Sequence, residues 1–240
     1  MSDRAQRPIV FLDFDGTISI GDVVDTILER YADLDWLRVE QEWAAGRLGS
    51  RECLQQQMAL VRASRAEIDT LLDDVQVDEG LVPLLEACTR HRLAVHIVSD
   101  GFDCFIHRIL ARLSPEARQL LDGVRVCASH LEPLAGGRWR TAFPFFRRPC
   151  AHGCATCKPA VMRALNPSGA PALFVGDGLS DRYASVDAAV VFAKDKLARF
   201  CSEHGIAYVH YESLADVGAF IDETIRRERA WPPAAAAASA

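Results

Sequence analysis

Residues 9–17 constrain the fold most, because an apolar run here ends in two carboxylates one residue apart, Asp13 and Asp15. Continuous apolarity indicates a strand that is buried on both faces of a parallel sheet, and Gly16 ends it. Side chains alternate along a strand, so Asp13 and Asp15 are expected to point the same way at its carboxyl end, unless the backbone turns there. Two like charges so close are costly without a positive neighbour. A divalent cation and a phosphate-binding lysine would meet that need.

Polar clusters also follow two later apolar runs, residues 93–98 and 172–175. The residues in these clusters that can carry chemistry are Ser99, Asp100, Gly101, Asp177 and Asp181. Between the two runs, Lys158-Pro159 opens a predicted helix, since proline suits the first helical turn. Ligands of open parallel α/β sheets bind outside the carboxyl ends of the strands, so we expect these clusters to converge.

The segment after the first strand has helical rather than strand periodicity. We interpret residues 21–75 as a helical cap domain, inserted into a core made of residues 1–20 and 76–229. The alternative is that these helices cross over within one domain, although a crossover between parallel strands usually needs about one helix. The expected fold class is therefore α/β, a Rossmann-like parallel sheet in a three-layer αβα core with a helical cap inserted after the first strand.

Two further segments lack regular periodicity. Residues 130–156 are rich in Gly, Pro, Arg and Cys, so we expect an irregular insertion in the core, with a short hairpin near Gly136-Gly137. The alanine-rich residues 230–240 have no reason to pack and are expected to form a disordered tail.

The composition excludes several classes of partner. The 240 residues carry a net charge of -6, which gives no electrostatic reason to expect nucleic acid or an anionic membrane. No apolar run approaches the roughly 20 residues of a membrane span, and the polar beginning predicts no signal peptide. We therefore expect a cytoplasmic protein whose eight cysteines are mostly reduced.

Four motifs occur in a definite order: Asp-x-Asp-Gly-Thr at residues 13–17, Ser99, Lys158, and Gly-Asp-Gly-x-x-Asp at residues 176–181. Each motif alone is weak, because an Asp-x-Asp after a strand also occurs as a turn or a helix cap. The ordered set resembles the pattern of phosphatases of the haloacid dehalogenase superfamily. The resemblance covers residues 8–227.

The resemblance implies catalytic roles for the two aspartates. Asp13 would be the nucleophile that takes the phosphoryl group as an aspartyl phosphate. Asp15 would protonate the leaving oxygen and later activate water. The phosphate-binding residues that the resemblance suggests are Ser99, Asp100, Gly101 and Lys158.

The resemblance also implies a Mg²⁺ cofactor. The ion would be bound by a side-chain oxygen of Asp13, the backbone carbonyl of Asp15 and the carboxylate of Asp177. Asp181 would position the metal shell or its waters, or would instead cap the helix that follows Ser180. Oxygen-only ligands with waters retained suit Mg²⁺ rather than zinc.

The position of the helical insertion resembles the branch that includes phosphoserine phosphatases and the methionine-salvage phosphatases of 2-hydroxy-3-keto-5-methylthiopentenyl-1-phosphate. Phosphoserine phosphatases grip the amino acid with a cap glutamate and a cap arginine; the best-matching positions here hold Asp22 and Gln57. Without the arginine, a substrate carboxylate lacks its natural partner. Residues 150–159 and 192–195 are similar to segments of the methionine-salvage branch.

The cysteine-rich approach to Lys158 suggests a possible structural Zn²⁺ site. Cys150, Cys154 and Cys157, with His152 or Cys127 as a fourth ligand, have a compatible spacing. A disulfide, a redox-active pair and free thiols are the alternatives.

The expected function is Mg²⁺-dependent hydrolysis of a small phosphorylated metabolite, with the methionine-salvage enol phosphate and phosphoserine as candidate substrates. A phosphomutase requires nearly the same residues. A non-catalytic phosphometabolite-binding protein is a further alternative, although binding alone does not require Asp15. The sequence also allows a homodimer, because Trp36 and Trp43 could pack either in the interior of the cap or in a contact between subunits.

Overall fold

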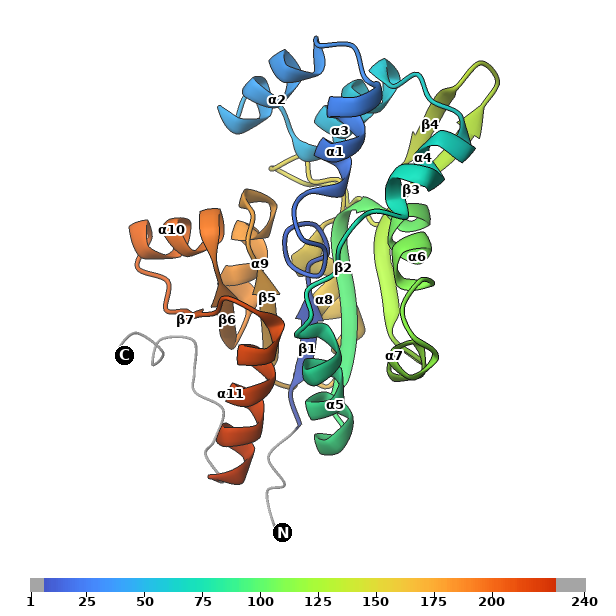
Figure 1. The fold of residues 1–240 in the computed structure, drawn as a ribbon. Helices are drawn as coiled ribbons and strands as arrows, with labels where there is room; N and C mark the ends of the chain where they lie inside the picture. The colour runs from blue at the N-terminus through green and yellow to red at the C-terminus, as the bar shows by residue number, and fades with distance from the viewer. Residues whose placement is uncertain (1–6, 228–240) are drawn as a thin grey trace.

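The computed structural model describes residues 7–227, which are built around a seven-stranded sheet of order β4-β3-β2-β1-β5-β6-β7 (Figure 1). The strands are β1 (Ile9–Leu12), β2 (Ala94–Phe102), β3 (Arg125–Leu134), β4 (Arg138–Ala142), β5 (Ala172–Gly176), β6 (Val190–Ala193) and β7 (Val209–His210). All neighbouring strands pair in parallel except β3 and β4, which are antiparallel. The central strand β1 lies between β2 and β5, with Leu12 opposite both Ile97 and Val175. The carboxyl-terminal ends of these three strands therefore meet at one edge of the sheet.

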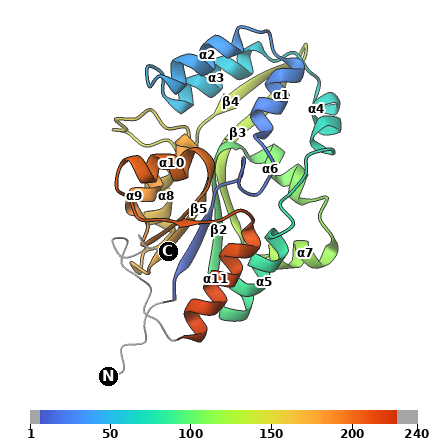
Figure 2. The same ribbon diagram turned by 60° about the vertical axis from the view of Figure 1, so that its left-hand side comes forward.

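Helices cover both faces of the sheet (Figures 1 and 2). They are α5 (Leu81–His91), α6 (Asp103–Leu110), α7 (Pro115–Leu120), α8 (Lys158–Leu165), α9 (Arg182–Asp187), α10 (Asp195–Glu203) and α11 (Leu214–Arg226). Val10 and Leu12 pack on one face with apolar residues of α5, α6 and α11, whereas Phe11 packs on the other with those of α8, α9 and α10. This alternation explains the continuous apolarity of β1. The predicted three-layer α/β class is confirmed.

Four helices lie beyond the carboxyl ends of the strands (Figure 1). They are α1 (Val23–Tyr31), α2 (Trp36–Ala44), α3 (Ser50–Leu60) and α4 (Arg65–Leu72). Their apolar faces pack inward, and Ile27, Met58 and Ile68 are fully buried. Ser64 caps α4 in a reciprocal capping box with Glu67. We refer to residues 21–75 as the cap; its separation from the core as a domain remains our proposal.

Residues 130–142 are regular, so the expectation of an irregular insertion is wrong for this half of the segment. Here β3 continues to Leu134 and returns as β4, which makes the hairpin at Gly136-Gly137 longer than expected. The hairpin extends to the cap, where Gly137 O accepts the N–H of Ala63 (3.0 Å) and Trp139 Nε1 donates to Ala63 O (3.0 Å). Trp139 is buried by this contact. The hairpin thus forms a direct connection between the core and the cap.

No helix within residues 7–227 is both long and apolar enough to cross a membrane. The predicted tail, residues 230–240, lies outside the described residues.

Candidate active site

Asp13 and Asp15 lie where the central strand ends. Asp13 directly follows β1, and its N–H donates to Val175 O (2.9 Å), so β5 fixes its position. The chain then turns, because the N–H of Ile18 donates to Phe14 O (2.8 Å). The two carboxylates therefore have different partners, as expected if the backbone turns after the strand.

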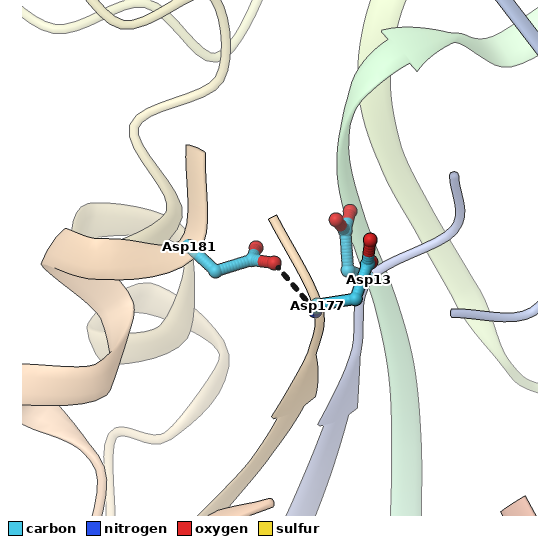
Figure 3. Close-up of side chains that lie close together, drawn as sticks. All are labelled: Asp13, Asp177 and Asp181. Atoms are coloured by element: carbon cyan, nitrogen blue, oxygen red, sulfur yellow. Dashed lines mark hydrogen bonds between the residues drawn. The ribbon is translucent and has the colours of Figure 1, made fainter. Parts of the chain in front are cut away.

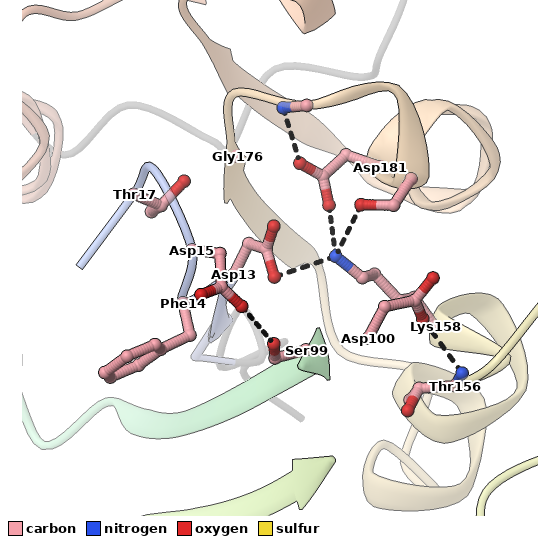
Figure 4. Close-up of polar contacts among 12 residues, drawn as sticks. Asp13, Phe14, Asp15, Thr17, Ser99, Asp100, Thr156, Lys158, Gly176 and Asp181 are labelled. Carbon is pink, nitrogen blue, oxygen red and sulfur yellow. Dashed lines mark hydrogen bonds and ion pairs between the residues drawn. The ribbon is translucent and has the colours of Figure 1, made fainter. Parts of the chain in front are cut away.

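Asp13 forms a buried ion pair with Lys158, the first residue of α8 (Figure 4). Lys158 Nζ lies 2.8 Å from Asp13 Oδ1 and 2.5 Å from Asp181 Oδ1, and it also donates to Ser180 Oγ at 3.3 Å. Burial alone would lower the pKa of Lys158, but the charges of Asp13, Asp181 and Asp100 raise it above its usual value. Lys158 is therefore an ammonium at neutral pH.

Asp15 faces the end of β2 instead. Its carboxylate accepts the N–H of Val23 (3.0 Å) and the hydroxyl of Ser99 (3.3 Å), and Ser99 Oγ in turn accepts the N–H of Gly101 (2.9 Å). A Cβ on Gly101 would lie 2.4 Å from Asp15 Oδ2, so a larger residue here would displace the Asp15 carboxylate. Burial, followed by the charge of Asp22, raises the pKa of Asp15 well above its usual value. A raised pKa favours the protonated form of a carboxyl group, which is the form that acts as a general acid.

The side chain of Asp100 points toward the cysteine-rich segment. Its Oδ1 accepts the N–H of Thr156 (2.8 Å), as Figure 4 shows. Asp100 also lines the cavity, but a carboxylate would repel phosphate, so its phosphate-binding role stays a prediction that does not extend to the side-chain oxygens. Its observed role is to hold the segment that leads into Lys158.

Three carboxylates, those of Asp13, Asp177 and Asp181, lie close together (Figure 3). Asp13, Asp177 and Asp181 each offer an oxygen within 4.8 Å of the others. Asp181 Oδ2 accepts the N–H groups of Asp177 (3.1 Å) and Gly178 (3.0 Å), and its Oδ1 contacts the lysine. Both Asp181 oxygens are thus already engaged, which suits a positioning role. The alternative that Asp181 caps the next helix is wrong, because it makes no side-chain cap hydrogen bond to α9.

Asp177 is oriented by Thr17, whose hydroxyl donates to Asp177 Oδ1 at 2.8 Å. Burial and the charge of Asp181 raise the pKa of Asp177 to about 7. Burial and Asp181 also raise the pKa of Asp13, against the opposing effect of Lys158. The cluster therefore carries more negative charge than one lysine balances, and a divalent cation would relieve the excess.

These groups open onto a cavity of about 610 Å³ between the core and the cap. Asp22 and Gln57, the two expected cap contacts, both line it. Asp22 also caps α1, accepting the N–H of Asp25 (2.9 Å), and Gln57 Nε2 donates to Glu40 Oε2 (3.0 Å). Both residues thus have structural partners as well as access to a ligand.

Sequence reasoning missed several cavity residues. They are Asp25, Glu40 and Trp43 from the cap, and Lys194, Lys196 and Arg199 from the core. Burial and the charge of Asp22 raise the pKa of Asp25 to about 7, with Lys196 opposing them. Nothing in the local pattern of α1, α2 or α10 distinguishes the charged helical residues from a solvated helix face. Signals existed only for Trp43, an expected cap or subunit contact, and for Lys194, which lies in the segment 192–195.

The structure does not support the Zn²⁺ site. Within residues 7–227, the one group of three or more potential ligands close enough to share an ion is the aspartate cluster. The ring of His152 stacks on Tyr183 with centroids 3.8 Å apart, so the imidazole is engaged outside the cysteine group. All eight cysteines are free, so the disulfide alternative is not formed either.

Comparison with known proteins places this site in a family. The sequence model of the haloacid dehalogenase-like hydrolase family matches residues 10–185, and the chain belongs to this family.

Curated relatives are more specific in name. The chain is 25% identical over 228 residues to the 2-hydroxy-3-keto-5-methylthiopentenyl-1-phosphate phosphatase of Bacillus pumilus (strain SAFR-032), covering 94% of this chain and 95% of the relative. It is 26% identical over 216 residues to the protein of the same name from Exiguobacterium sp. (strain ATCC BAA-1283 / AT1b), covering 88% and 96% respectively.

Solved structures support the fold. A phosphoserine phosphatase with a phospho-aspartyl intermediate analogue superposes with a TM-score of 0.66 at 16% identity, covering 90% of this chain and 99% of that one. A HAD family hydrolase from Salmonella enterica subsp. enterica serovar Typhi gives 0.65 at 17% identity, covering 91% and 72%. At this identity the likeness concerns the fold alone.

Proposed function

We propose that the chain is a Mg²⁺-dependent phosphatase that hydrolyses a small phosphomonoester through an aspartyl phosphate on Asp13. The observation that carries the proposal is the buried Lys158–Asp13 ion pair at the wall of a cavity of about 610 Å³. A nucleophilic carboxylate beside a fixed ammonium suits attack on an anionic phosphorus centre, because the ammonium offsets the repulsion between the two.

In the first step, an Asp13 oxygen attacks phosphorus and the ester oxygen leaves with the proton of Asp15. Ser99 and Lys158 hold the non-bridging oxygens through the displacement. In the second step, Asp15 takes a proton from water, the water oxygen attacks phosphorus, and the bond to Asp13 breaks. The raised pKa of Asp15, caused first by burial, suits the protonated form that the first step needs.

The residues present fit a Mg²⁺ ion. Asp13 and Asp177 offer carboxylate oxygens within 4.8 Å of each other, and the donor set contains oxygen alone. The Asp15 backbone carbonyl would be a further ligand, while Asp181 positions the Asp177 loop. When bound, the cation neutralises charge on the phosphoryl oxygens and on Asp13.

For the substrate, we propose the enol phosphate that names the curated relatives, or an ester of similar size. Gln57 supports this choice, since its amide bonds Glu40 and provides no cation for a substrate carboxylate. A second candidate is phosphoserine. The cavity holds acidic groups (Asp22, Asp25 and Glu40) and basic groups (Lys196 and Arg199), a mixture that could accept an amino acid.

The test is phosphate release from both esters by the Mg²⁺-loaded protein, each alone and in competition. We expect release from the enol phosphate, with a larger kcat/KM than for phosphoserine. Binding of the esters without turnover would favour a binding protein. Transfer to a second hydroxyl of the substrate, rather than to water, would favour a mutase.

A further inference from the structure

Tyr211 lies beneath the proposed metal site although it belongs to none of the four motifs. It stands between β7 and α11 and is 1% exposed. Its hydroxyl donates to Gly176 O (3.3 Å) and lies 3.4 Å from Thr17 Oγ1. Gly176 directly precedes Asp177, and Thr17 donates a hydrogen bond to its carboxylate. Tyr211 therefore connects the carboxyl-terminal part of the core to Asp177.

The direction of these hydrogen bonds follows from counting protons. Thr17 has one hydroxyl proton and donates it to Asp177 Oδ1 at 2.8 Å. In its contact with Tyr211, Thr17 can then only accept, so Tyr211 is the donor. The single Tyr211 proton is shared between Thr17 Oγ1 and the Gly176 carbonyl. A directed chain therefore runs from Tyr211 through Thr17 to Asp177.

We infer that Tyr211 is a positioning residue for the Mg²⁺-binding carboxylate of Asp177. By donating to Thr17, it keeps the threonine proton directed at Asp177 Oδ1, which leaves Oδ2 available for the ion. By donating to Gly176, it also fixes the end of β5 from which Asp177 projects. Partners of metal-binding carboxylates affect metal affinity because they hold each ligand oxygen in place. The inference rests on the proposed Mg²⁺ function.

The aromatic ring has a separate contact. Lys194 Nζ, in the cavity wall, lies 5.1 Å from the ring centroid of Tyr211. A Tyr211→Phe substitution keeps this cation–π contact and the packing, and it removes only the hydroxyl. The substitution therefore tests the hydrogen-bond chain alone.

The experiment is calorimetric titration of the metal-free full-length protein with MgCl₂. We expect Tyr211→Phe to weaken Mg²⁺ binding about 10-fold, the lower end of the effect of outer ligand partners. Tyr208→Phe is the matched control, because its hydroxyl contacts Ser202 Oγ (3.0 Å) away from the cavity; its affinity should equal that of the wild type. In turnover assays, Tyr211→Phe should raise the Mg²⁺ concentration for half-maximal rate, with the kcat at saturating Mg²⁺ largely retained.

A double-mutant cycle tests whether Tyr211 acts through Thr17. Thr17→Val removes the hydroxyl that both partners use, so adding Tyr211→Phe to it should cause little further loss of affinity. If the two substitutions weaken Mg²⁺ binding additively, Tyr211 does not act through Thr17. A Tyr211→Phe variant that melts earlier but binds Mg²⁺ normally would also overturn the proposed role. A wild-type protein that does not bind Mg²⁺ would instead overturn the metal assignment itself. Normal Mg²⁺ affinity in both wild type and Tyr211→Phe would overturn only the role of Tyr211.

Discussion

The ammonium of Lys158 lies 2.8 Å from Asp13 Oδ1, with the lysine 1% and the aspartate 4% exposed. The same ammonium contacts Asp181, so one cation serves two carboxylates from different elements. A buried charge without its partner is strongly unfavourable. Lys158 therefore holds the candidate nucleophile in place before any substrate arrives, and the site and the stability of the core depend on the same residue.

Replacing Lys158 with Met should affect both properties. Activity should fall about 100-fold or more, because a fixed cationic donor to the phosphoryl oxygens is lost. The free energy of unfolding should fall by about 3–5 kcal/mol, measured by urea titration, because buried carboxylates lose their partner. The control is Arg65→Met, which removes an exposed pair with Asp69 (2.7 Å) and should change stability by less than about 1 kcal/mol. Equal losses in the two variants would contradict the buried-pair interpretation.

Asp13→Asn should abolish turnover of an aryl phosphate while leaving the fold intact. The side chains have the same shape, but the amide is not a nucleophile. Because burial, with Asp181, raises the pKa of Asp13, ionising this group is unfavourable in the folded protein. This cost offsets the lost ion pair with Lys158, which keeps Asp181 as its carboxylate partner, so the melting temperature should stay close to that of the wild type in metal-free buffer at pH 7. If Asp13→Asn turned over the aryl phosphate at the wild-type rate, Asp13 could not be the nucleophile.

Two glycines with similar positive φ angles allow a matched test of the metal loop. Gly16 has φ +73° and Gly21 has φ +82°, so alanine is strained by about 1–2 kcal/mol at either. A Cβ on Gly16 would lie 2.2 Å from Asp177 Oδ2, whereas nothing lies within 4 Å of one on Gly21. We expect both variants to lose similar stability to strain, and only Gly16→Ala to lose Mg²⁺ affinity in calorimetry as well. Equal Mg²⁺ affinities would show that Asp177 can shift without cost.

The pH dependence of stability should reveal the raised pKa of Asp177. Burial, with the charge of Asp181, raises it from 3.8 to about 7. Between these values the unfolded chain has lost a proton that the folded protein keeps, so metal-free stability is lost as the pH rises from about 4 to 7. Asp177→Asn removes this loss. The difference in melting temperature between Asp177→Asn and the wild type should increase from about pH 4 to 7 and then level off. A difference that does not change with pH would contradict the raised pKa of Asp177.

Much of the site follows from local pattern. Asp13 and Asp177 directly follow β1 and β5, and Ser99 follows the apolar residues 93–98 within β2. The carboxyl ends of parallel strands share one edge, so the proximity of these residues could be predicted. Lys158 could be placed because Lys158-Pro159 begins a helix. The sequence allowed two arrangements after Leu12, a continued strand or a backbone turn, and it could not decide between them. The structure shows the turn, because β1 ends at Leu12.

Other features depend on contacts between distant segments. The β3–β4 hairpin is long because Trp139 packs and hydrogen-bonds against Ala63, 76 positions away. The Asp100 carboxylate accepts a hydrogen bond from Thr156, 56 positions away, and the cysteines of residues 150–157 do not assemble a metal site. None of these outcomes is encoded in periodicity or spacing.

The sequence by itself therefore determined the α/β class, the order of the strands that carry chemistry and the aspartate pair, because apolar runs and chain order specify which residues end a buried strand. Only the tertiary structure decided which groups share each proton and charge. Tyr211 and Thr17 are 194 positions apart, and their hydroxyls meet 3.4 Å from each other through packing of the whole core. Hydrogen bonds and ion pairs act over a few ångströms, so they depend on the packed structure and leave no mark on local sequence.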